Sequence, residues 1–204
     1  MGRRVVITGL GVCAPNGVGL TDFTQALLDG KSGIRHQPNL EKLGFGCQVA
    51  GEPLVKDNLI NSYFTPLERR GLNASGIVYG VIAGVDAWND ARLVKNTTNE
   101  PSWDRGIVFG TGILGVDKFR EAIHLIDDGN VRRLGSTSVI QTMASGISAY
   151  LGGMLGCGNQ VTTNSAACTT GTEGIVMAYD RISQGKAEIM LTGSCSDSGP
   201  YVWG

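Results

Sequence analysis

The sequence predicts an α/β fold in which helices pack on a largely buried sheet. Short apolar runs such as residues 106–110 are typical of buried strands. Other stretches place apolar residues at helical spacing on one face, namely Val78, Val81, Ile82, Val85 and Trp88. Strands and helices of these kinds alternate along the chain, which indicates a sheet covered by helices.

The expected elements follow one another at short intervals. Strands are expected at residues 4–8, 106–110, 160–163 and 188–192. Helices are expected at residues 21–29, 116–126, 139–155 and 169–183. Another helix should start at Thr65, because Thr65 is a good cap, Pro66 suits the first position and Glu68 the third. Residues 35–62 show no clear period and are predicted to be irregular.

Composition argues against several classes of protein. The 204 residues carry a net charge of −1, which gives no general attraction to nucleic acid or to an anionic membrane. The five cysteines form no C-x-x-C pair, which argues against a disulfide framework or a zinc site and favours a reducing compartment. The N-terminal apolar run breaks at Thr8, so we expect no signal peptide and a cytoplasmic protein. No cofactor and no metal site are expected.

Residues 134–172 form an unusually long uncharged segment. These 39 residues include no Asp, Glu, Lys, Arg or His. Polar residues and glycines are scattered through the segment and no apolar window is long enough to span a bilayer, so we expect no membrane span. The composition instead predicts burial in a core, in a subunit interface or in an enclosed site.

A glycine cluster at residues 110–115 matches the pattern G-x-G-x-x-G of dinucleotide-binding proteins. Such a site also needs an acidic residue at the end of a second strand about 20 residues further on. The acids in that region, Asp127 and Asp128, instead precede Gly129 at the end of an expected helix. A dinucleotide-binding oxidoreductase therefore stays a distant alternative, and a glycine turn between closely packed backbones is favoured.

The strongest chemical signal lies at residues 164–171, which read Asn-Ser-Ala-Ala-Cys-Thr-Thr-Gly. A short strand runs into small residues, then Cys168, then a helix, and small neighbours permit a tight turn that projects the sulfur. The free N–H groups at a helix N-terminus stabilise negative charge on a thiolate or on a thioester oxyanion. An isolated cysteine is also often a small buried apolar residue, so the residues alone leave both alternatives open.

Several segments together resemble the elongating β-ketoacyl-[acyl-carrier-protein] synthases. They are the opening strand and turn at 5–11, the helix at 79–85, the glycine turn at 110–115, the segments 143–146 and 166–169, and the strand at 187–193. The similarity covers essentially the whole chain, in order. It implies the N-terminal half of a thiolase-like fold, with a mixed sheet and helices packed on it, so that residues 1–204 form a single domain.

The resemblance also implies the chemistry. Cys168 would take an acyl chain from a carrier-protein or coenzyme A thioester, and the carbanion of a decarboxylated malonyl-carrier thioester would attack that ester. The product would be a 3-oxoacyl-[acyl-carrier-protein], in fatty-acid or type II polyketide synthesis. The family's two histidines come from the C-terminal half, and neither His36 nor His124 matches their motifs. We therefore expect that half beyond Gly204 or on another chain. A catalytically incomplete structural partner of a complete synthase is the alternative.

The resemblance further implies how substrates and partners bind. Ile113 would close the acyl pocket at the partner subunit's nucleophile in a homodimer, with Met143 and Ala167 as further substrate-binding residues. Arg69 and Arg70 open a helix in the region where relatives use basic residues to dock the acyl carrier protein. A solvated helix end explains these two arginines equally well.

Overall fold

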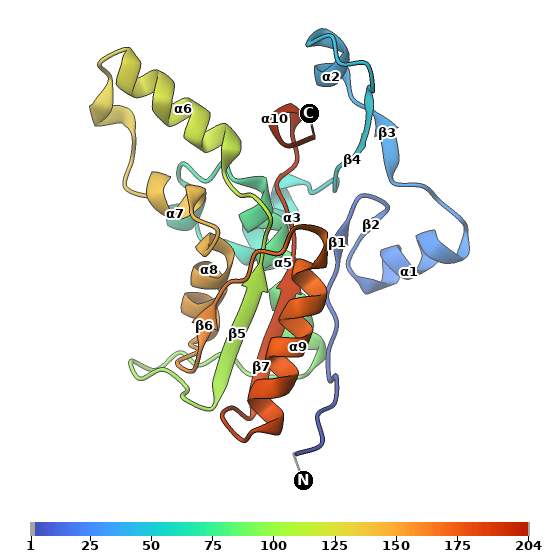
Figure 1. The fold of residues 1–204 in the computed structure, drawn as a ribbon, viewed down its shortest axis with the longest axis vertical. Helices are drawn as coiled ribbons and strands as arrows, with labels where there is room; N and C mark the ends of the chain where they lie inside the picture. Colours follow the sequence, from blue (N-terminus) through green and yellow to red (C-terminus); the bar gives the residue numbers. More distant parts are fainter. Residues whose placement is uncertain (1–2, 204) are drawn as a thin grey trace.

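The computed structural model describes residues 3–203, which form a parallel sheet with helices on both faces (Figure 1). Its strands run in the order β6 (Val161–Thr162), β5 (Arg105–Gly110) and β7 (Ile189–Ser194). The resemblance implied a mixed sheet, whereas the pairing of these three strands is parallel. Within residues 3–203, antiparallel pairing occurs in two hairpins, β1 (Cys13–Ala14) with β2 (Gly17–Val18) and β3 (Ile34–His36) with β4 (Val49–Gly51).

Helices account for most of the remaining regular structure. They are α1 (Leu20–Leu28), α2 (Pro38–Lys42), α3 (Asp57–Tyr63), α4 (Pro66–Arg69), α5 (Ser75–Asp90), α6 (Val116–Asp127), α7 (Ser138–Thr142), α8 (Gly146–Leu155), α9 (Thr170–Ser183) and α10 (Pro200–Trp203), with 3-10 turns η1 (Val131–Arg133) and η2 (Ala167–Thr169). Helix α9 crosses one face of the sheet, while α5 and α8 lie behind the other (Figure 1). No helix of the described part of the chain is long and apolar enough to cross a membrane.

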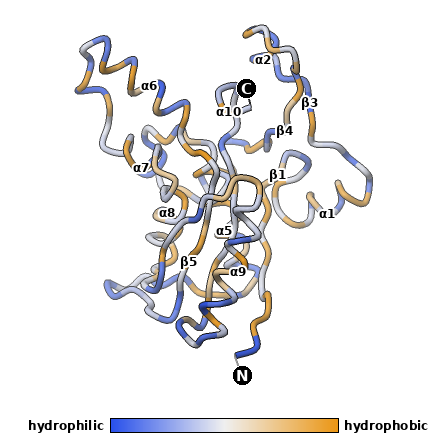
Figure 2. The backbone as a smooth tube through the Cα atoms, viewed as in Figure 1, coloured by the Kyte–Doolittle hydropathy of each residue, from blue (hydrophilic) through white to orange (hydrophobic). Residues whose placement is uncertain are grey.

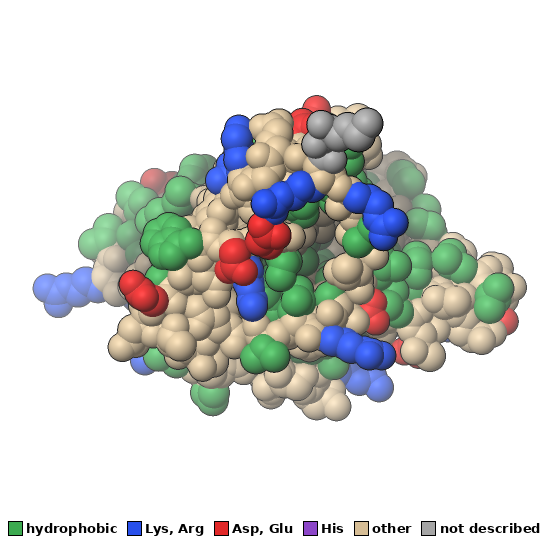
Figure 3. Space-filling view, turned by 90° about the horizontal axis from the view of Figure 1, so that it is seen from below, with side chains coloured by type: hydrophobic (Ala, Val, Ile, Leu, Met, Phe, Trp, Pro, Cys, Tyr) green, Lys and Arg blue, Asp and Glu red, His purple; other side chains and the backbone are tan. Residues whose placement is uncertain are grey.

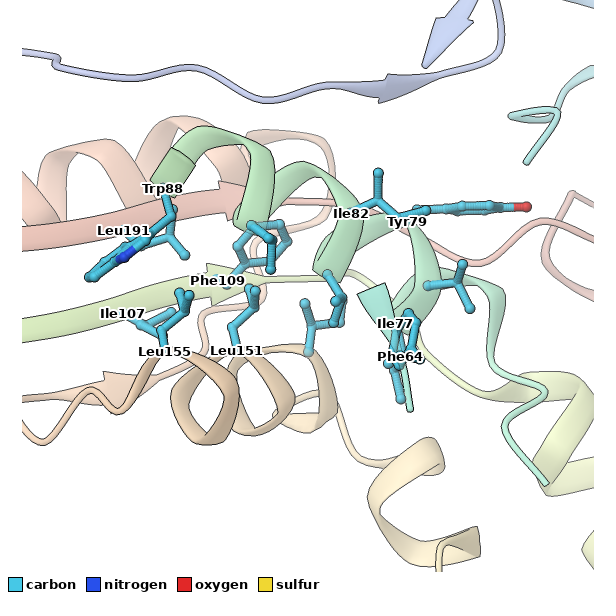
Figure 4. Close-up of a cluster of buried hydrophobic side chains, with 14 of the residues drawn as sticks. Phe64, Ile77, Tyr79, Ile82, Trp88, Ile107, Phe109, Leu151, Leu155 and Leu191 are labelled. Atoms are coloured by element: carbon cyan, nitrogen blue, oxygen red, sulfur yellow. The ribbon is translucent and has the colours of Figure 1, made fainter. Parts of the chain in front are cut away.

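The core lies between α5, α8 and the sheet. The helical periodicity is confirmed, since Val78, Val81, Ile82, Val85 and Trp88 are all buried. Figure 4 shows side chains of α5 in one cluster with Ile107 and Phe109 of β5 and with Leu151 and Leu155 of α8. Because β5 is covered on both faces, its sequence is continuously apolar and does not alternate.

The parallel order of the strands decides where their connecting loops meet. The carboxyl ends of parallel strands lie at one edge of a sheet, and ligand sites in α/β proteins form at that edge. Strand β5 there leads into residues 110–115, β6 into residues 163–169 and β7 into residues 195–199. Three segments far apart in the sequence are therefore neighbours.

Two predicted elements differ in detail from the structure. The single helix expected at 139–155 is divided into α7 and α8, because the backbone is extended at Met143, with a ψ of 135°. Gly146 then approaches the carbonyl of Ile140 so closely that no side chain would fit. Residues 35–62 are not irregular, since they contain α2, β4 and α3. Apart from the strand predicted at residues 4–8, the remaining predicted strands and helices hold closely, and the cap at Thr65 is a complete capping box with Glu68.

The buried strand predicted at residues 4–8 is wrong. The segment is extended, but within the described chain it pairs with no strand, and Val6 and Ile7 are 57% and 78% exposed. A cavity of about 320 Å³ lies between it, α9 and β7. The apolar residues of the extended segment are visible as an orange stretch near the N-terminus in Figure 2. Figure 3, which views the molecule from below, shows hydrophobic side chains in a hollow. An apolar composition alone is therefore not sufficient to predict that this segment pairs with the sheet.

Gly80 of α5 gives a test of the core packing. A Cβ there would lie 2.5 Å from Cγ2 of Ile147 and 3.1 Å from Sγ of Cys195. We expect Gly80→Ala to lower the free energy of unfolding by about 1–3 kcal/mol, because overpacking outweighs the gain in helix propensity. The matched control is Gly153→Ala on α8, where a Cβ meets open space, and it should stabilise by up to about 1 kcal/mol. Urea unfolding measures the free energy of unfolding of both variants. Equal changes in Gly80→Ala and Gly153→Ala would contradict the close packing at Gly80.

Candidate active site

The candidate site surrounds Cys168, which lies in η2 immediately before α9. Its side chain is exposed, so the sequence alternative of a buried apolar cysteine does not apply. The preceding residue, Ala167, has a φ of 49°, in the left-handed region that is unfavourable for residues other than glycine. The chain therefore makes a sharp turn between β6 and α9 and presents Cys168 at its outer side.

Threonine hydroxyls hold this turn in place. The hydroxyl of the buried Thr170 accepts a hydrogen bond from the N–H of Ala166 (2.8 Å) and donates one to the carbonyl of Ala167 (2.7 Å). The hydroxyl of Thr169 donates to the carbonyl of Ala166 at 2.8 Å. The Asn164 amide donates to the carbonyl of Thr170 at 2.7 Å. These bonds satisfy backbone groups that a sharp turn would otherwise leave without partners.

The glycine turn at residues 110–115 packs directly against the turn that carries Cys168. A Cβ on Gly110 would lie 2.5 Å from the carbonyl oxygen of Asn164, so only glycine fits. A Cβ on Gly112 would lie 3.9 Å from Cα of Ala167, which places this part of the glycine turn beside the residue that precedes Cys168. Gly115 has a φ of 70°, and its N–H donates to the buried carboxylate of Asp197. Because an internal carboxylate occupies this helix N-terminus, it is not free to bind a pyrophosphate.

The other predicted substrate-binding residues lie around the same edge. Ile113 and Met143 are each 49% exposed, and Ala167 is exposed. The Thr163 hydroxyl donates to the carbonyls of Phe109 (2.6 Å) and Ala144 (3.3 Å), which ties the segment next to Met143 to the end of β5. The uncharged segment 134–172 is thus only partly buried, and its large exposed apolar side chains are Val139, Met143 and Val161.

The other cysteines differ from Cys168 in their surroundings. Burial is the main cause that raises the pKa of Cys13 to about 12 and that of Cys157 to about 11. Burial also raises the pKa of Cys195, well above its ordinary value, and the nearby Asp197 adds to the effect. Cys47 is exposed like Cys168, but it lies next to β4, away from the three loops.

The two histidines take no part in this arrangement. His36 lies in β3 beside Glu41, with the imidazole Nε2 3.3 Å from a carboxylate oxygen. His124 lies on α6. The hydrogen bonds that hold the turn around Cys168 involve neither of them. Within residues 3–203, no three His, Cys, Asp or Glu side chains are grouped so that they could hold a metal ion.

The two predicted docking arginines do not open a helix, since Arg69 is the last residue of α4 and Arg70 follows it, and they lie in different surroundings. The guanidinium of Arg69 is 2.9 Å from the Asp57 carboxylate. Arg70 instead lines a cavity of about 730 Å³ together with Lys118, Arg132 and Arg133. Lys118 is buried and pairs with Glu121 at 3.0 Å, and this hydrogen bond is the main cause of the lowered pKa of Glu121. The cavity is therefore strongly basic.

Sequence reasoning missed several residues of this region. Arg132 and Arg133 are adjacent basic residues at the edge of the uncharged segment, and that contrast was a usable signal. Thr170 stands two residues after Cys168 and could have been recognised as a local partner of the turn. Asp197 gave no signal, because its partners Gly76 and Gly115 lie 121 and 82 residues away.

Comparison with known proteins agrees with these observations. Residues 2–202 match the family described as Beta-ketoacyl synthase, N-terminal domain. A 3-oxoacyl-[acyl-carrier-protein] synthase 2 of Vibrio harveyi is 32% identical over 191 residues, covering 94% of this chain and 45% of the relative. The enzyme of the same name from Synechocystis is 31% identical, and the match covers 94% of this chain and 45% of the relative. The chain thus spans about half the length of the curated relatives it matches.

Solved structures show the same fold. The ishigamide ketosynthase/chain length factor superposes with a TM-score of 0.82 at 22% identity, covering 100% of this chain and 50% of that one. A second match is a type II polyketide synthase acyl-carrier protein in complex with its ketosynthase bound to the hexaketide. It gives a TM-score of 0.75 at 25% identity, and the match covers 95% of this chain and 45% of that one. The thiolase-like fold is thereby confirmed, and the dinucleotide-binding alternative loses its basis. The chain belongs to the β-ketoacyl synthase family, of which it matches the N-terminal domain.

Proposed function

We propose that this protein catalyses the decarboxylating condensation of an acyl chain on Cys168 with malonyl-[acyl-carrier-protein]. The observation that carries the proposal is the exposed Cys168 on a sharp turn stabilised by Thr170, at the edge where three loops meet. Such a turn presents a nucleophile and leaves room for a thioester in front of it. The product would be a 3-oxoacyl-[acyl-carrier-protein] of fatty-acid or type II polyketide synthesis.

The reaction proceeds in two transfers. The sulfur of Cys168 attacks the thioester carbonyl, the acyl–sulfur bond to the carrier breaks, and the carrier thiol leaves with a proton. The malonyl thioester then loses carbon dioxide, and the resulting carbanion attacks the acyl carbonyl on Cys168. A carbon–carbon bond forms, the bond to Cys168 breaks, and the 3-oxoacyl product leaves on the carrier. Residues outside this chain would stabilise the carbanion, since neither His36 nor His124 belongs to the site.

A second half of the synthase would cover the open face of α9. Ile175, Val176 and Tyr179 are each more than half exposed there and form an apolar strip. A contiguous exposed apolar surface is typical of a face that another element covers. The relatives are about twice as long as this chain, so they include a second segment of about the length of this chain.

The basic cavity lined by Arg70, Arg132 and Arg133 would dock an acidic acyl carrier protein. These three side chains are exposed and, within the described residues, form no ion pair. Unpaired basic side chains attract an acidic partner and speed its association. Arg69 is a weaker candidate, because Asp57 already neutralises it.

Ile113 would limit the length of the acyl chain. The expected pocket lies at the partner subunit's nucleophile. Because the turn that carries Ile113 lies against Ala167 of its own chain, we propose that Ile113 also borders the acyl pocket at the Cys168 of the same chain. A homodimer formed through the exposed residues Val139, Met143 and Val161 would close it from the other side.

The alternative is a structural partner subunit without condensing activity. One observation favours it, since the fold matches that of the ishigamide ketosynthase/chain length factor. An intact Cys168 in an accessible turn favours the enzyme. Acylation of Cys168 distinguishes the two.

Acyl transfer to Cys168 is the first test. Incubating the complete protein with an acyl-[acyl-carrier-protein] should add the acyl mass to the peptide that contains Cys168. Cys168→Ala should abolish this without unfolding, because alanine fits among small neighbours. The matched control is Cys47→Ala, which removes the other exposed cysteine and should leave acylation unchanged. Peptide mass spectrometry reads the result, and acyl mass on Cys47, or none in the wild-type protein, would contradict the enzyme.

Charge reversal tests the docking cavity. Replacing Arg70, Arg132 and Arg133 by Glu should raise KM for the carrier-bound substrate roughly tenfold or more, at about 0.5–1 kcal/mol for each charge. The effect should shrink as salt is added, because salt screens exposed charges. KM for a coenzyme A thioester should not change. Arg69→Glu, which removes a neutralised charge, should act more weakly, and equal effects on both substrates would argue against docking.

Substitution of Ile113 tests the chain-length proposal. Ile113→Phe should exclude longer acyl chains about five- to hundredfold, because overpacking a closed apolar pocket costs about 1–3 kcal/mol. Ile113→Ala should admit them. Ile123→Phe on α6 is the control, because this exposed isoleucine lies outside the turn. Acyl-chain preference and Tm are measured together, and a lowered Tm with an unchanged preference would refute the proposal.

A further inference from the structure

Asp197 is a buried carboxylate that no cation in the described chain neutralises. It is 7% exposed and takes part in no ion pair among residues 3–203. Burying a charge in this way is costly unless other groups stabilise it. The stabilising groups here are backbone N–H donors from two helices.

The two oxygens of Asp197 serve different helices. Oδ1 accepts a hydrogen bond from the N–H of Gly76 at 2.6 Å and lies 3.3 Å from the hydroxyl of Ser75. Both residues belong to the first turn of α5, whose cap residue Ala74 offers no side-chain acceptor. Oδ2 accepts a hydrogen bond from the N–H of Gly115, the residue that caps α6. One carboxylate therefore caps two helix N-termini, whose dipoles favour negative charge.

The segment that carries Asp197 also holds the glycine turn at both ends. At the start of the turn, the N–H of Cys195 donates to the carbonyl of Gly110 at 3.2 Å. At its end, Asp197 holds Gly115. Within the turn, the hydroxyl of Thr111 donates to the carbonyl of Ile113 at 2.8 Å. The position of Ile113 relative to Cys168 thus depends on a carboxylate that touches neither.

We infer that Asp197 is a positioning residue that sets the acyl-chain length accepted at Cys168, by holding the Ile113 turn against the turn that carries the nucleophile. The inference rests on the proposed role of Ile113. Loss of the carboxylate frees the N–H of Gly115 and lets the turn move away from Ala167. The space beside Cys168 then widens, and longer chains enter.

The test uses alkyl methanethiosulfonates of graded chain length, which transfer their alkylthio group to the thiolate and release methanesulfinate. The readout is the ratio of modification rates at Cys168 for short and long reagents, followed by peptide mass spectrometry in the complete protein. Asp197→Ala should reduce the preference for short reagents by about two- to thirtyfold, the range typical of a change that acts through a supporting contact. Asp197→Asn keeps the shape and one acceptor oxygen and should have a smaller effect in the same direction.

Two controls separate positioning from general stability. Asp117→Asn removes the neighbouring exposed carboxyl of α6, whose pKa is raised by partial burial and by the charge of Asp197, and it should leave the ratio unchanged. Adding formate to Asp197→Ala should restore the wild-type ratio, because a small anion can occupy the vacated position at the two helix N-termini.

The outcomes are distinct. A lowered Tm with a wild-type ratio in both Asp197 variants would overturn the inference, and so would a wild-type protein without any length preference. Disulfide formation with the reagent needs only an accessible thiol, so it reports on the turn even where acyl transfer fails. Failure of the wild-type protein to form an acyl-Cys168 refutes the proposed function and leaves this measurement intact.

Discussion

The site depends on a close approach at the end of the central strand. Where β5 ends, Gly110 passes under the turn that follows β6, and the absence of a side chain lets the backbone come within contact of Asn164 and Thr170. Any Cβ there would overlap with both residues. The glycine turn and the turn that carries Cys168 can therefore lie side by side. The helix that follows each turn leaves this edge in its own direction, α6 away from the sheet and α9 across it (Figure 1).

The composition of the neighbouring segment follows from this close packing. Turns that approach one another expose backbone N–H and carbonyl groups to a region without water, and these groups need partners. Hydroxyl and amide side chains supply them at small volume, as Thr163, Asn164 and Thr170 do. A charged side chain would require an ion partner of its own. The uncharged stretch at residues 134–172 thus reflects a demand for compact polar groups, in addition to the burial that its composition indicates.

Asp197 is a charged side chain that is buried near this edge of the sheet without an ion partner in the described chain. Its surroundings explain why this buried charge is tolerated. Two helix N-termini direct their free N–H groups at the carboxylate, so that backbone dipoles replace a cation. The same interaction connects α5 with the glycine turn and with the segment that follows β7. A single buried charge thereby links the core to the edge at which Cys168 lies.

Local patterns in the sequence determined the main elements of the core and one helix cap. The spacing from Val78 to Trp88 specifies α5, the apolar run of β5 specifies a strand covered on both sides, and Thr65 with Glu68 specifies a capping box, because each depends on residues a few positions apart. The motif around Cys168 and the family resemblance were readable for the same reason. Only the tertiary structure decided that residues 4–8 stay outside the sheet, that Arg70 joins Arg132 and Arg133, and that Asp197 caps two distant helices. These features arise from contacts between residues far apart in the chain, which leave no periodic or local trace in the sequence.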